Sequence, residues 1–345
     1  MKTRIPVFDL HSDIPVDIAR RRAFGERAVF KTRHFERLVE GGIQAAILVL
    51  WVEPEHRCRS AQRIVELLGA LIADLHESSD CVELVSNEES LKNCIGRGKF
   101  AVFLGVEGMT FVEQWSLGGT SNMADWQQSD ALYEKFRQSF GILNQFTLRH
   151  AILVWGEQNQ IASGPGTFFD EASRVGLTDF GRHVVQELDR SNIIIDVSHL
   201  DETSTEDVLT TTQGVVIASH SNARALCDHP RNLSDRHICK IGDRGGVIGI
   251  NAYANFIDPV NPTVDRYVDH VVYIANLIGI EHVALGFDFM DYLPDTFGFS
   301  EKTTGLTNAS DVPGLIERLY KRGFTEREVE QLAFQNALRI VGKDK

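Results

Sequence analysis

Two short apolar runs, each ending in a histidine, constrain the fold of this chain more than any other feature. Residues 192–199 (NIIIDVSH) and 214–220 (GVVIASH) are rich in β-branched side chains and end in polar clusters, which is typical of buried strands. Residues 203–206 between them have the Ser/Thr-x-x-Glu pattern of a capping box, which predicts the start of one helix. The unit is therefore predicted to be strand, helix, strand, with the two strands parallel.

Parallel strands joined by one helix point the same way, so His199 and His220 should emerge at the same carboxyl edge of one sheet. That edge is where α/β folds place their ligands. Two neighbouring imidazoles suit a metal such as zinc, which takes histidine nitrogen and carboxylate oxygen. A single strand-end histidine is more often a hydrogen-bonded structural residue than a metal ligand. Residues elsewhere in the chain are therefore needed to distinguish the two roles.

Strand-like and helix-like segments alternate along all 345 residues, without a linker or low-complexity tract. Eight strands are predicted, at residues 5–13, 43–52, 100–108, 142–150, 192–199, 214–220, 245–251 and 282–288. Most of them are followed by a helical segment. This pattern predicts a (β/α)8 TIM-like barrel, one α/β domain spanning residues 1–345, with the active site at the C-terminal rim of the strands. A surface excursion is expected at about residues 109–135.

Six of the eight predicted strands would deliver an ionisable residue to that rim. These residues are, in chain order, His11 with Asp13, then Glu107, His150, His199, His220 and Asp288. His11 and Asp13 would project to one side, because alternate residues of a strand share a face. Each ending alone is a weak signal, but six converging by chance is improbable. The joint pattern predicts a metal-centred active site.

Composition excludes several other classes of protein. A net charge of −13 argues against a nucleic-acid partner, which would need clustered cations. Five scattered cysteines without a Cys-x-x-Cys pair indicate neither a disulfide framework nor a thiolate zinc site. The longest apolar run, residues 45–52, is far too short to span a membrane, and no signal-peptide core is apparent at the N-terminus. A cytoplasmic protein without nucleic-acid or membrane partners is expected.

The sequence resembles the renal (membrane) dipeptidase family, a branch of the metal-dependent amidohydrolase superfamily. Residues 9–15 resemble the Asp-Gly-His-Asn-Asp-x-Pro opening of that family, residues 105–108 its Gly-x-Glu-Gly block, and residues 285–289 its Gly-Ser-Asp-Phe-Asp segment. Residues 196–199 and 218–232 match most closely. The similarity spans nearly the whole chain.

The resemblance implies a zinc-dependent dipeptidase with two Zn²⁺ per chain. His11 and Asp13 would hold one ion, His199 and His220 would hold the other, and Glu107 would bridge the two ions. A hydroxide between the ions would be the nucleophile, because bound metals lower the pKa of water to about 7.

The resemblance also implies roles for three further residues. Asp288 would be the base that takes the proton of the hydroxide and later gives it to the departing amine. His150 would hydrogen-bond the oxygen that gains charge. Arg231 would bind the carboxylate of a dipeptide, including dipeptides with a C-terminal D-residue, although by itself Arg231 could equally cap a helix or pair with Asp228 or Asp235. Family members often dimerise, so a homodimer is also an option.

Some positions depart from the family pattern and leave the substrate open. Residues 108–110 (Gly-Met-Thr) replace Gly-Gly-His, residues 151–154 are aliphatic rather than polar, and Phe287 and Met290 are bulky. One alternative is therefore a related amidohydrolase that acts on another small amide bearing a carboxylate. Another is an inactive metal-binding homologue. The presence of Asp288 and His150, which are not needed to hold metal, argues against the latter.

Overall fold

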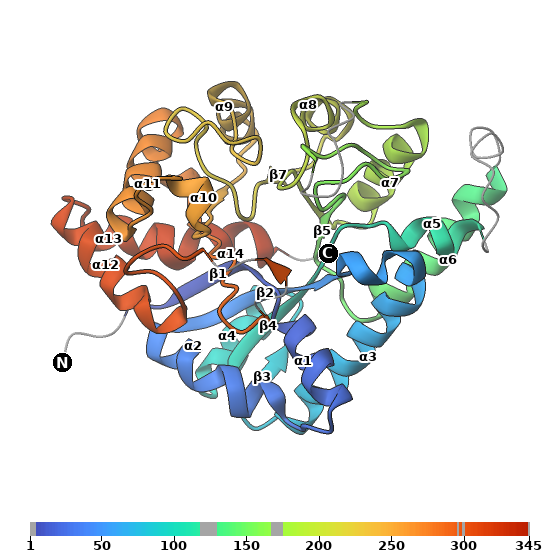
Figure 1. The fold of residues 1–345 in the computed structure, drawn as a ribbon, viewed down its shortest axis with the longest axis horizontal. Coiled ribbons are helices and arrows are strands. Elements are labelled where there is room, and N and C mark those ends of the chain that lie inside the picture. Colours follow the sequence, from blue (N-terminus) through green and yellow to red (C-terminus); the bar gives the residue numbers. More distant parts are fainter. Residues whose placement is uncertain (1–4, 118–129, 167–174, 295–296, 299–300, 344–345) are drawn as a thin grey trace.

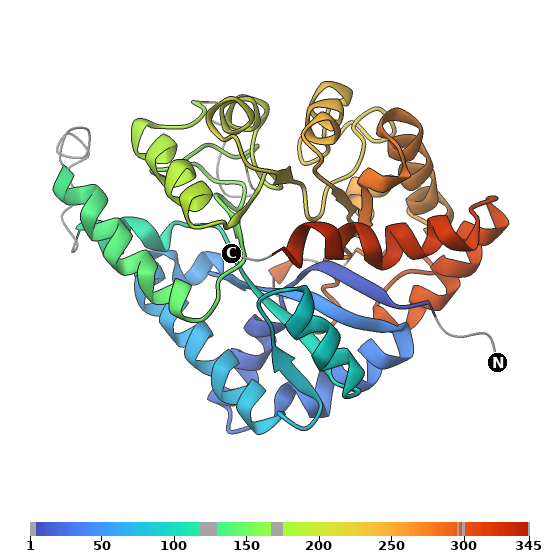
Figure 2. The same cartoon turned by 180° about the vertical axis from the view of Figure 1, so that it is seen from behind.

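The computed structural model describes residues 5–117, 130–166, 175–294, 297–298 and 301–343. Eight parallel strands curve into a nearly closed barrel, and helices lie around its outside (Figures 1 and 2). The barrel strands are β1 (Val7–Ser12), β2 (Ile43–Trp51), β4 (Phe100–Glu107), β5 (His150–Ile152), β6 (Ile194–Asp196), β7 (Val216–Ile217), β8 (Ile248–Ile250) and β9 (Val283–Leu285). The predicted (β/α)8 barrel is confirmed.

The strands are hydrogen-bonded in the order β7-β6-β5-β4-β2-β1-β9-β8. Between the two ends of this path, a single parallel bridge joins Ala218 to Ile248. Three backbone hydrogen bonds support it, from Ala218 N to Val247 O, from Gly249 N to Ala218 O, and from Ser221 N to Gly249 O, at 2.8–3.0 Å. This seam between β7 and β8 completes the ring.

The covering helices bury one apolar face each; in α7, for example, Phe180, Val184 and Leu188 are buried at four-residue spacing. The helices are α1 (Ile14–Ala23), α2 (Phe35–Gly41), α3 (Ser60–Glu77), α4 (Glu88–Gly96), α5 (Phe111–Leu117), α6 (Asp130–Gln145), α7 (Asp179–Arg190), α8 (Glu202–Thr211), α9 (Asp235–Asp243), α10 (Ala254–Ile257), α11 (Val264–Ile278), α12 (Val312–Lys321), α13 (Glu326–Glu330) and α14 (Asn336–Val341). Short 3₁₀ or π segments are η1 (Phe30–His34), η2 (Pro54–Arg59), η4 (Ile280–His282), η6 (Ala309–Asp311) and η7 (Gln331–Gln335). Among the described residues, no helix combines the length and apolarity needed to cross a bilayer.

Alternation along β4 shows how a buried strand points a polar residue into the barrel mouth. Ala101 and Phe103 pack in the barrel interior, whereas Val102 and Leu104 pack in the larger core beneath the helices. Because alternate residues share a face, Glu107 continues the inward series at the C-terminal end of the strand. The whole strand is buried, as expected of a parallel sheet covered on both sides.

The predicted fourth strand, residues 142–150, is wrong in its boundaries. Its first four residues belong to α6, whose buried residues Phe136, Phe140 and Leu143 recur at helical spacing. The chain turns at Thr147, which has a left-handed φ of 58°. Strand pairing therefore begins at His150 instead of ending there.

Other predicted details also need correction. A short strand that the sequence analysis missed, β3 (Val82–Leu84), pairs with the first half of β4. The N-cap of α8 is Asp201, whose side chain accepts a hydrogen bond from Ser204 N, so the predicted capping box at residues 203–206 is wrong. In the predicted excursion, residues 109–135, the structure shows α5 and the start of α6, and residues 118–129 lie outside the described part.

Candidate metal centre

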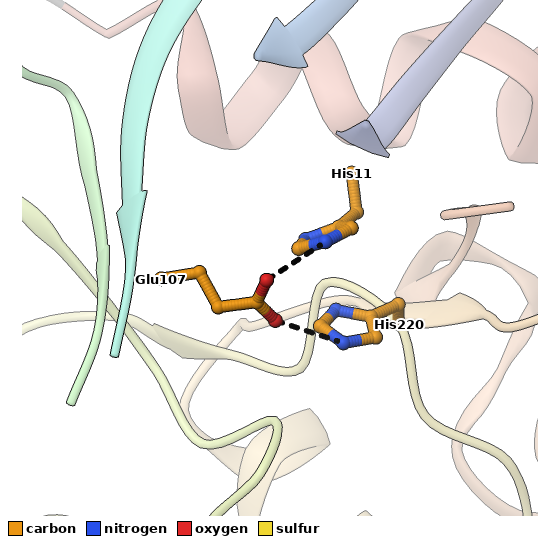
Figure 3. Close-up of side chains that lie close together, drawn as sticks. All are labelled: His11, Glu107 and His220. Atoms are coloured by element: carbon orange, nitrogen blue, oxygen red, sulfur yellow. Dashed lines mark ion pairs between the residues drawn. The ribbon is translucent and has the colours of Figure 1, made fainter. Parts of the chain in front are cut away.

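Glu107 lies at the centre of a buried cluster at the C-terminal rim of the barrel. Its two carboxylate oxygens face different partners: Oε1 is 3.0 Å from His199 Nε2 and 3.6 Å from His220 Nε2. Oε2 is 3.6 Å from Nε2 of His11. Figure 3 shows His11 and His220 on opposite oxygens of this carboxylate. The structure thus divides the cluster into two sides that share Glu107.

The first side is formed by β1 and the loop after β9. His11 Nε2 lies 3.5 Å from Asp13 Oδ2 and 3.8 Å from Asp288 Oδ1. One donor atom from each of these three residues lies within 4.8 Å of the others, and the same holds for His11, Glu107 and His220. The structure thus brings together six of the seven residues predicted to meet at this rim, while His150 lies deeper in the barrel. The roles of all seven remain proposals.

Burial and charge set the protonation of the donors. Burial lowers the pKa of His199 to about 4 and that of His220 well below its usual value, so both imidazoles are neutral near pH 7. Burial opposes ionisation of Glu107, but the nearby imidazoles of His11 and His199 outweigh burial and hold its pKa well below the usual range. His199 and His220 are thus in the neutral form that binds a metal, and Glu107 is ionised. Burial opposes protonation of His11, but the carboxylates of Glu107 and Asp13 outweigh burial and raise the pKa of His11 well above its usual value, so a bound ion would have to displace the proton of His11.

Several buried nitrogen and oxygen atoms of this cluster, all of types that can ligate a metal, have no hydrogen-bond partner in the described part of the chain. They are His11 Nδ1 and Nε2, Asp13 Oδ1, Glu107 Oε1 and His220 Nε2. Leaving such atoms unsatisfied costs about 1–3 kcal/mol each. Cations bound between them would satisfy several at once, and the nitrogen and carboxylate set is the one zinc takes. The residues therefore fit a metal site.

Two residues of the cluster have unusual backbone conformations. His199 follows β6 with φ 67°, and Asp288 follows β9 with φ 57°. The left-handed region is sparsely populated by residues other than glycine and clusters at functional sites. At His199 and Asp288 this backbone conformation changes the chain direction just after the strand ends, and both side chains lie in the cluster at the rim.

Asp288 carries a carboxyl group that is almost fully buried. Its Oδ2 accepts a hydrogen bond of 2.9 Å from Asn251 Nδ2, while its Oδ1 faces His11. Burial raises the pKa of Asp288 to about 8; the nearby His11 opposes the rise, and the carboxylates of Asp13 and Glu107 add to it. The group can thus exchange a proton near neutral pH.

Arg231, in the loop after β7, points its buried guanidinium toward this cluster. Nη2 donates to the backbone oxygen of His220 at 3.3 Å, and the guanidinium carbon lies 5.3 Å from the centre of the Phe256 ring. Its Nε has no hydrogen-bond partner among the described residues. Burial lowers the pKa of Arg231 to about 10, with Asp288 and Glu107 opposing, so the group stays charged at pH 7. Residues 222–232 contain no helix.

His150 lies below the rim, because it begins β5 and pairs in register with Gly105, two residues before Glu107. Its Nε2 is 2.6 Å from Asp196 Oδ2. Asp196 Oδ1 accepts hydrogen bonds from the backbone N–H groups of Ser198 (2.8 Å) and Ser219 (3.1 Å).

Asp196 and Asn251 had no predicted role, but in the structure their side chains bind His150 and Asp288. A carboxylate three residues before His199 at a strand end was a usable signal for Asp196. For Asn251 the only available signal was its place just after β8.

A nearly closed parallel barrel with histidines and carboxylates gathered at its C-terminal rim defines a class of metal-binding (β/α)8 proteins. Residues 133–345 match the model of the membrane dipeptidase family, peptidase family M19. The chain belongs to this family. The predicted family is therefore confirmed.

Similar proteins agree with this assignment. Dipeptidase tcpJ of Claviceps purpurea is 27% identical over 282 residues, which cover 81% of this chain and 57% of that protein. An uncharacterized dipeptidase of Schizosaccharomyces pombe is 32% identical over 207 residues, which cover 58% of this chain and 48% of that protein. The chain thus spans about half the length of these curated relatives. A metallopeptidase from Rhodobacter sphaeroides, solved with a phosphinate mimic of the dipeptide L-Ala-D-Ala, shares the fold with a TM-score of 0.81 at 20% identity over 98% of this chain and 99% of that one.

Proposed function

We propose that this chain is a zinc-dependent dipeptidase that binds two Zn²⁺. The observation that carries the proposal is the Glu107 carboxylate, which has one oxygen facing His11 and the other facing His199 and His220. Family membership and the two dipeptidase relatives support the reaction class.

In the proposed site, His11 and Asp13 hold one ion, His199 and His220 hold the other, and Glu107 is shared. The unpartnered nitrogen and oxygen atoms of these residues support this arrangement. When bound, the two ions would supply a water of lowered pKa and polarise the amide carbonyl.

Asp288 is proposed to move the proton. Its Oδ1 is directed at the cluster, within 3.8 Å of His11 Nε2. Without bound metal, burial raises the pKa of Asp288 to about 8, so its carboxyl group holds a proton at pH 7. Cations bound beside it would lower that pKa, and the ionised Asp288 could then accept a proton from water and return it to the departing amine.

Arg231 is proposed to bind the C-terminal carboxylate of the substrate. A guanidinium forms two parallel hydrogen bonds with a planar anion, and the unpartnered Nε leaves one such donor available. A clamp at a fixed distance from the metals limits the substrate to dipeptide length. The L-Ala-D-Ala mimic bound by the Rhodobacter sphaeroides protein supports acceptance of a C-terminal D-residue.

His150 is proposed to donate to the oxygen that gains charge, although here its Nε2 is bound to Asp196. With Nε2 held by Asp196, the ring nitrogen left for the substrate is Nδ1, which has no hydrogen-bond partner among the described residues. A His150→Gln variant tests it: a fall in kcat larger than about tenfold in a folded, metal-loaded protein supports the role. Loss of stability with unchanged kcat assigns His150 to the support of Asp196 instead.

Most of the residues that suggested a different amide substrate lie in the core, but Met290 is partly exposed and lines a pocket together with Asp288. Residues 151–154 are fully buried. The Phe287 ring is also buried and stacks on Phe289, with 4.8 Å between ring centres. Residues 151–154 and Phe287 therefore give no support to the alternative amidohydrolase, whereas Met290 is placed to contact a substrate beside Asp288.

The decisive experiment measures hydrolysis by the metal-free protein before and after addition of two equivalents of Zn²⁺. The substrates are L-L and L-D dipeptides, with N-acetyl amino acids and tripeptides as length and amine controls. Zinc-restored cleavage confined to dipeptides supports the proposal. Binding of two zinc ions without turnover of any substrate supports an inactive metal-binding homologue, and cleavage of N-acetyl amino acids alone supports the related amidohydrolase.

A further inference from the structure

One buried amide group connects Asp288 to the loop that carries Arg231. Asn251 follows β8 and is fully buried. Its Nδ2 donates to Asp288 Oδ2 at 2.9 Å. Among the hydrogen bonds of the described residues, it is the one that reaches the Asp288 carboxylate. The other carboxylate oxygen, Oδ1, is thereby left facing His11 and the cluster.

The orientation of this amide is fixed by a second contact. Asn251 Oδ1 accepts a hydrogen bond of 2.6 Å from the backbone N–H of Tyr253. A backbone N–H requires an acceptor, so the oxygen of the amide must lie on the Tyr253 side and the NH₂ group on the Asp288 side. The backbone N–H of Tyr253 therefore fixes Asn251 Nδ2 as the donor to Asp288.

Asn251 is itself held by another buried asparagine. Its backbone N–H donates to Asn222 Oδ1 at 2.9 Å, and its backbone oxygen accepts from Asn222 Nδ2 at 3.2 Å. Asn222 lies two residues after His220 and is also fully buried. Its Nδ2 donates in addition to the Phe256 oxygen at 3.1 Å, and the Phe256 ring lies against Arg231. The support of Asp288 is thus continuous with the support of the substrate clamp.

We propose that Asn251 is a positioning residue for Asp288. By holding Oδ2, it keeps Oδ1 as the oxygen that exchanges the proton and prevents rotation of the carboxyl group. Asn222 keeps Asn251 in place through the paired backbone contacts. The inference rests on the proposed dipeptidase function, because it assigns Asn251 to the reaction that Asp288 would perform. A misplacement of about 1 Å at a reacting group lowers rates by about 10²-fold.

The test compares the zinc-loaded wild-type protein with Asn251→Ser, Asp288→Asn and the double variant, using one dipeptide that the wild type hydrolyses. Serine can still accept from Tyr253 N–H but is too short to reach Asp288. We expect Asn251→Ser to lower kcat about 10–100-fold, to change KM less than about threefold, and to retain the zinc content. In the Asp288→Asn background, the same change should lower kcat less than about twofold, because its effect passes through Asp288.

Two controls keep the outcome interpretable. Asn251→Asp has nearly the same shape and also keeps an acceptor for Tyr253, but it replaces the donor with an oxygen, so it tests the role even if Asn251→Ser folds poorly. Asn232→Ala removes a hydrogen bond to the Phe256 oxygen without touching Asn251 or Asp288. Its effect should fall on KM through Arg231.

Several results would overturn the inference. They are an unchanged kcat in either folded, zinc-loaded Asn251 variant, an effect on KM alone, or losses that multiply in the double variant. If the wild type hydrolyses no dipeptide, it is the proposed function that fails, and that result is obtained before any variant is made.

Discussion

The two halves of the barrel hold their functional residues by different means. In the long-strand half (β1, β2 and β4), strands of six to nine residues form extended ladders, with seven register pairs between β2 and β4 alone. In the short-strand half (β5 to β9), each strand has only two or three residues. In that half, hydrogen bonds from buried polar side chains join the ends of neighbouring strands.

Asp196 and Asn251 show this difference most clearly. Asp196 joins His150 on β5 to backbone N–H groups after β6 and β7, and Asn251 joins the end of β8 to Asp288. At the junction of the two halves, Asp9 accepts from Phe287 N at 2.9 Å and supplements a single β1–β9 register pair. Backbone pairing along β4 therefore positions Glu107, whereas the positions of His199, His220 and Asp288 depend on hydrogen bonds from single side chains.

The largest effect is expected in the short-strand half at Asp288. Asp288→Asn keeps the shape and the left-handed turn but removes the proton acceptor, so kcat for dipeptides should fall about 10²–10⁴-fold. Steady-state kinetics with zinc analysis check this. Zinc content and melting temperature should stay close to those of the wild type. A variant with full kcat would show that another group moves the proton.

Asp196→Ala tests whether side chains replace the ladder in that half. Its removal leaves His150 and two backbone N–H groups buried without a partner, so the free energy of unfolding should fall by about 3–5 kcal/mol. The matched control is Ile47→Val in the middle of β2, where about 0.5–1.5 kcal/mol is expected. Urea denaturation measures both. A smaller loss for Asp196→Ala than for Ile47→Val would contradict the comparison.

Arg231→Ala probes a residue held by a loop alone. Loss of the charged hydrogen bonds to a substrate carboxylate should raise KM for dipeptides about 10–150-fold, which corresponds to about 1.5–3 kcal/mol. Arg231→Lys keeps the charge without the two-pronged geometry and should recover only part of the loss. Equal KM values for the wild type and Arg231→Ala would remove the clamp from the proposal.

Asp17 provides a pH-dependent test on the long-strand side. Burial would raise the pKa of Asp17, but hydrogen bonds from His34, Arg21 and Arg20 outweigh burial and hold its pKa below the usual value. A depressed pKa stabilises the fold above the unfolded-state pKa, and that contribution is lost as the pH falls through the folded-state pKa. Asp17→Asn should therefore destabilise by about 1–2 kcal/mol at pH 7, with a difference from the wild type that shrinks toward pH 3. Denaturation at several pH values shows whether it does; a constant difference would exclude the ionised pair.

The smallest effect concerns the start of α8. Asp201→Ala should cost about 1–2 kcal/mol, because it removes the acceptor of the hydrogen bonds from Ser204 N and Ser163 Oγ, whereas Thr203→Ala should cost less than about 0.5 kcal/mol. Thermal unfolding of the two variants separates them. The reverse order would restore the capping box that the sequence suggested.

The same comparison explains what could be predicted from the sequence. The barrel, and the meeting of His11, Asp13, Glu107, His199, His220 and Asp288, follow from strand endings and from the family resemblance, because parallel strands deliver their ends to one rim. The predicted position of His150 at the end of its strand was wrong, because the apolar residues at the end of an amphipathic helix can be mistaken for those of a short strand. The roles of Asp196 and Asn251 were missed, because hydrogen bonds between distant side chains leave no periodic pattern in the sequence.

The seam between β7 and β8 has a consequence for how the molecule opens. One bridge and three backbone hydrogen bonds close the barrel there, directly beneath the loop that begins with His220. Regions held by few contacts open locally before the rest of the fold, so amide hydrogens at this seam should exchange with solvent before those of β2 and β4. Ions held jointly by His220 and by residues across the barrel would connect the two sides of this seam. Metal binding would then shift the equilibrium toward the closed barrel, because a ligand that binds only the closed form stabilises it.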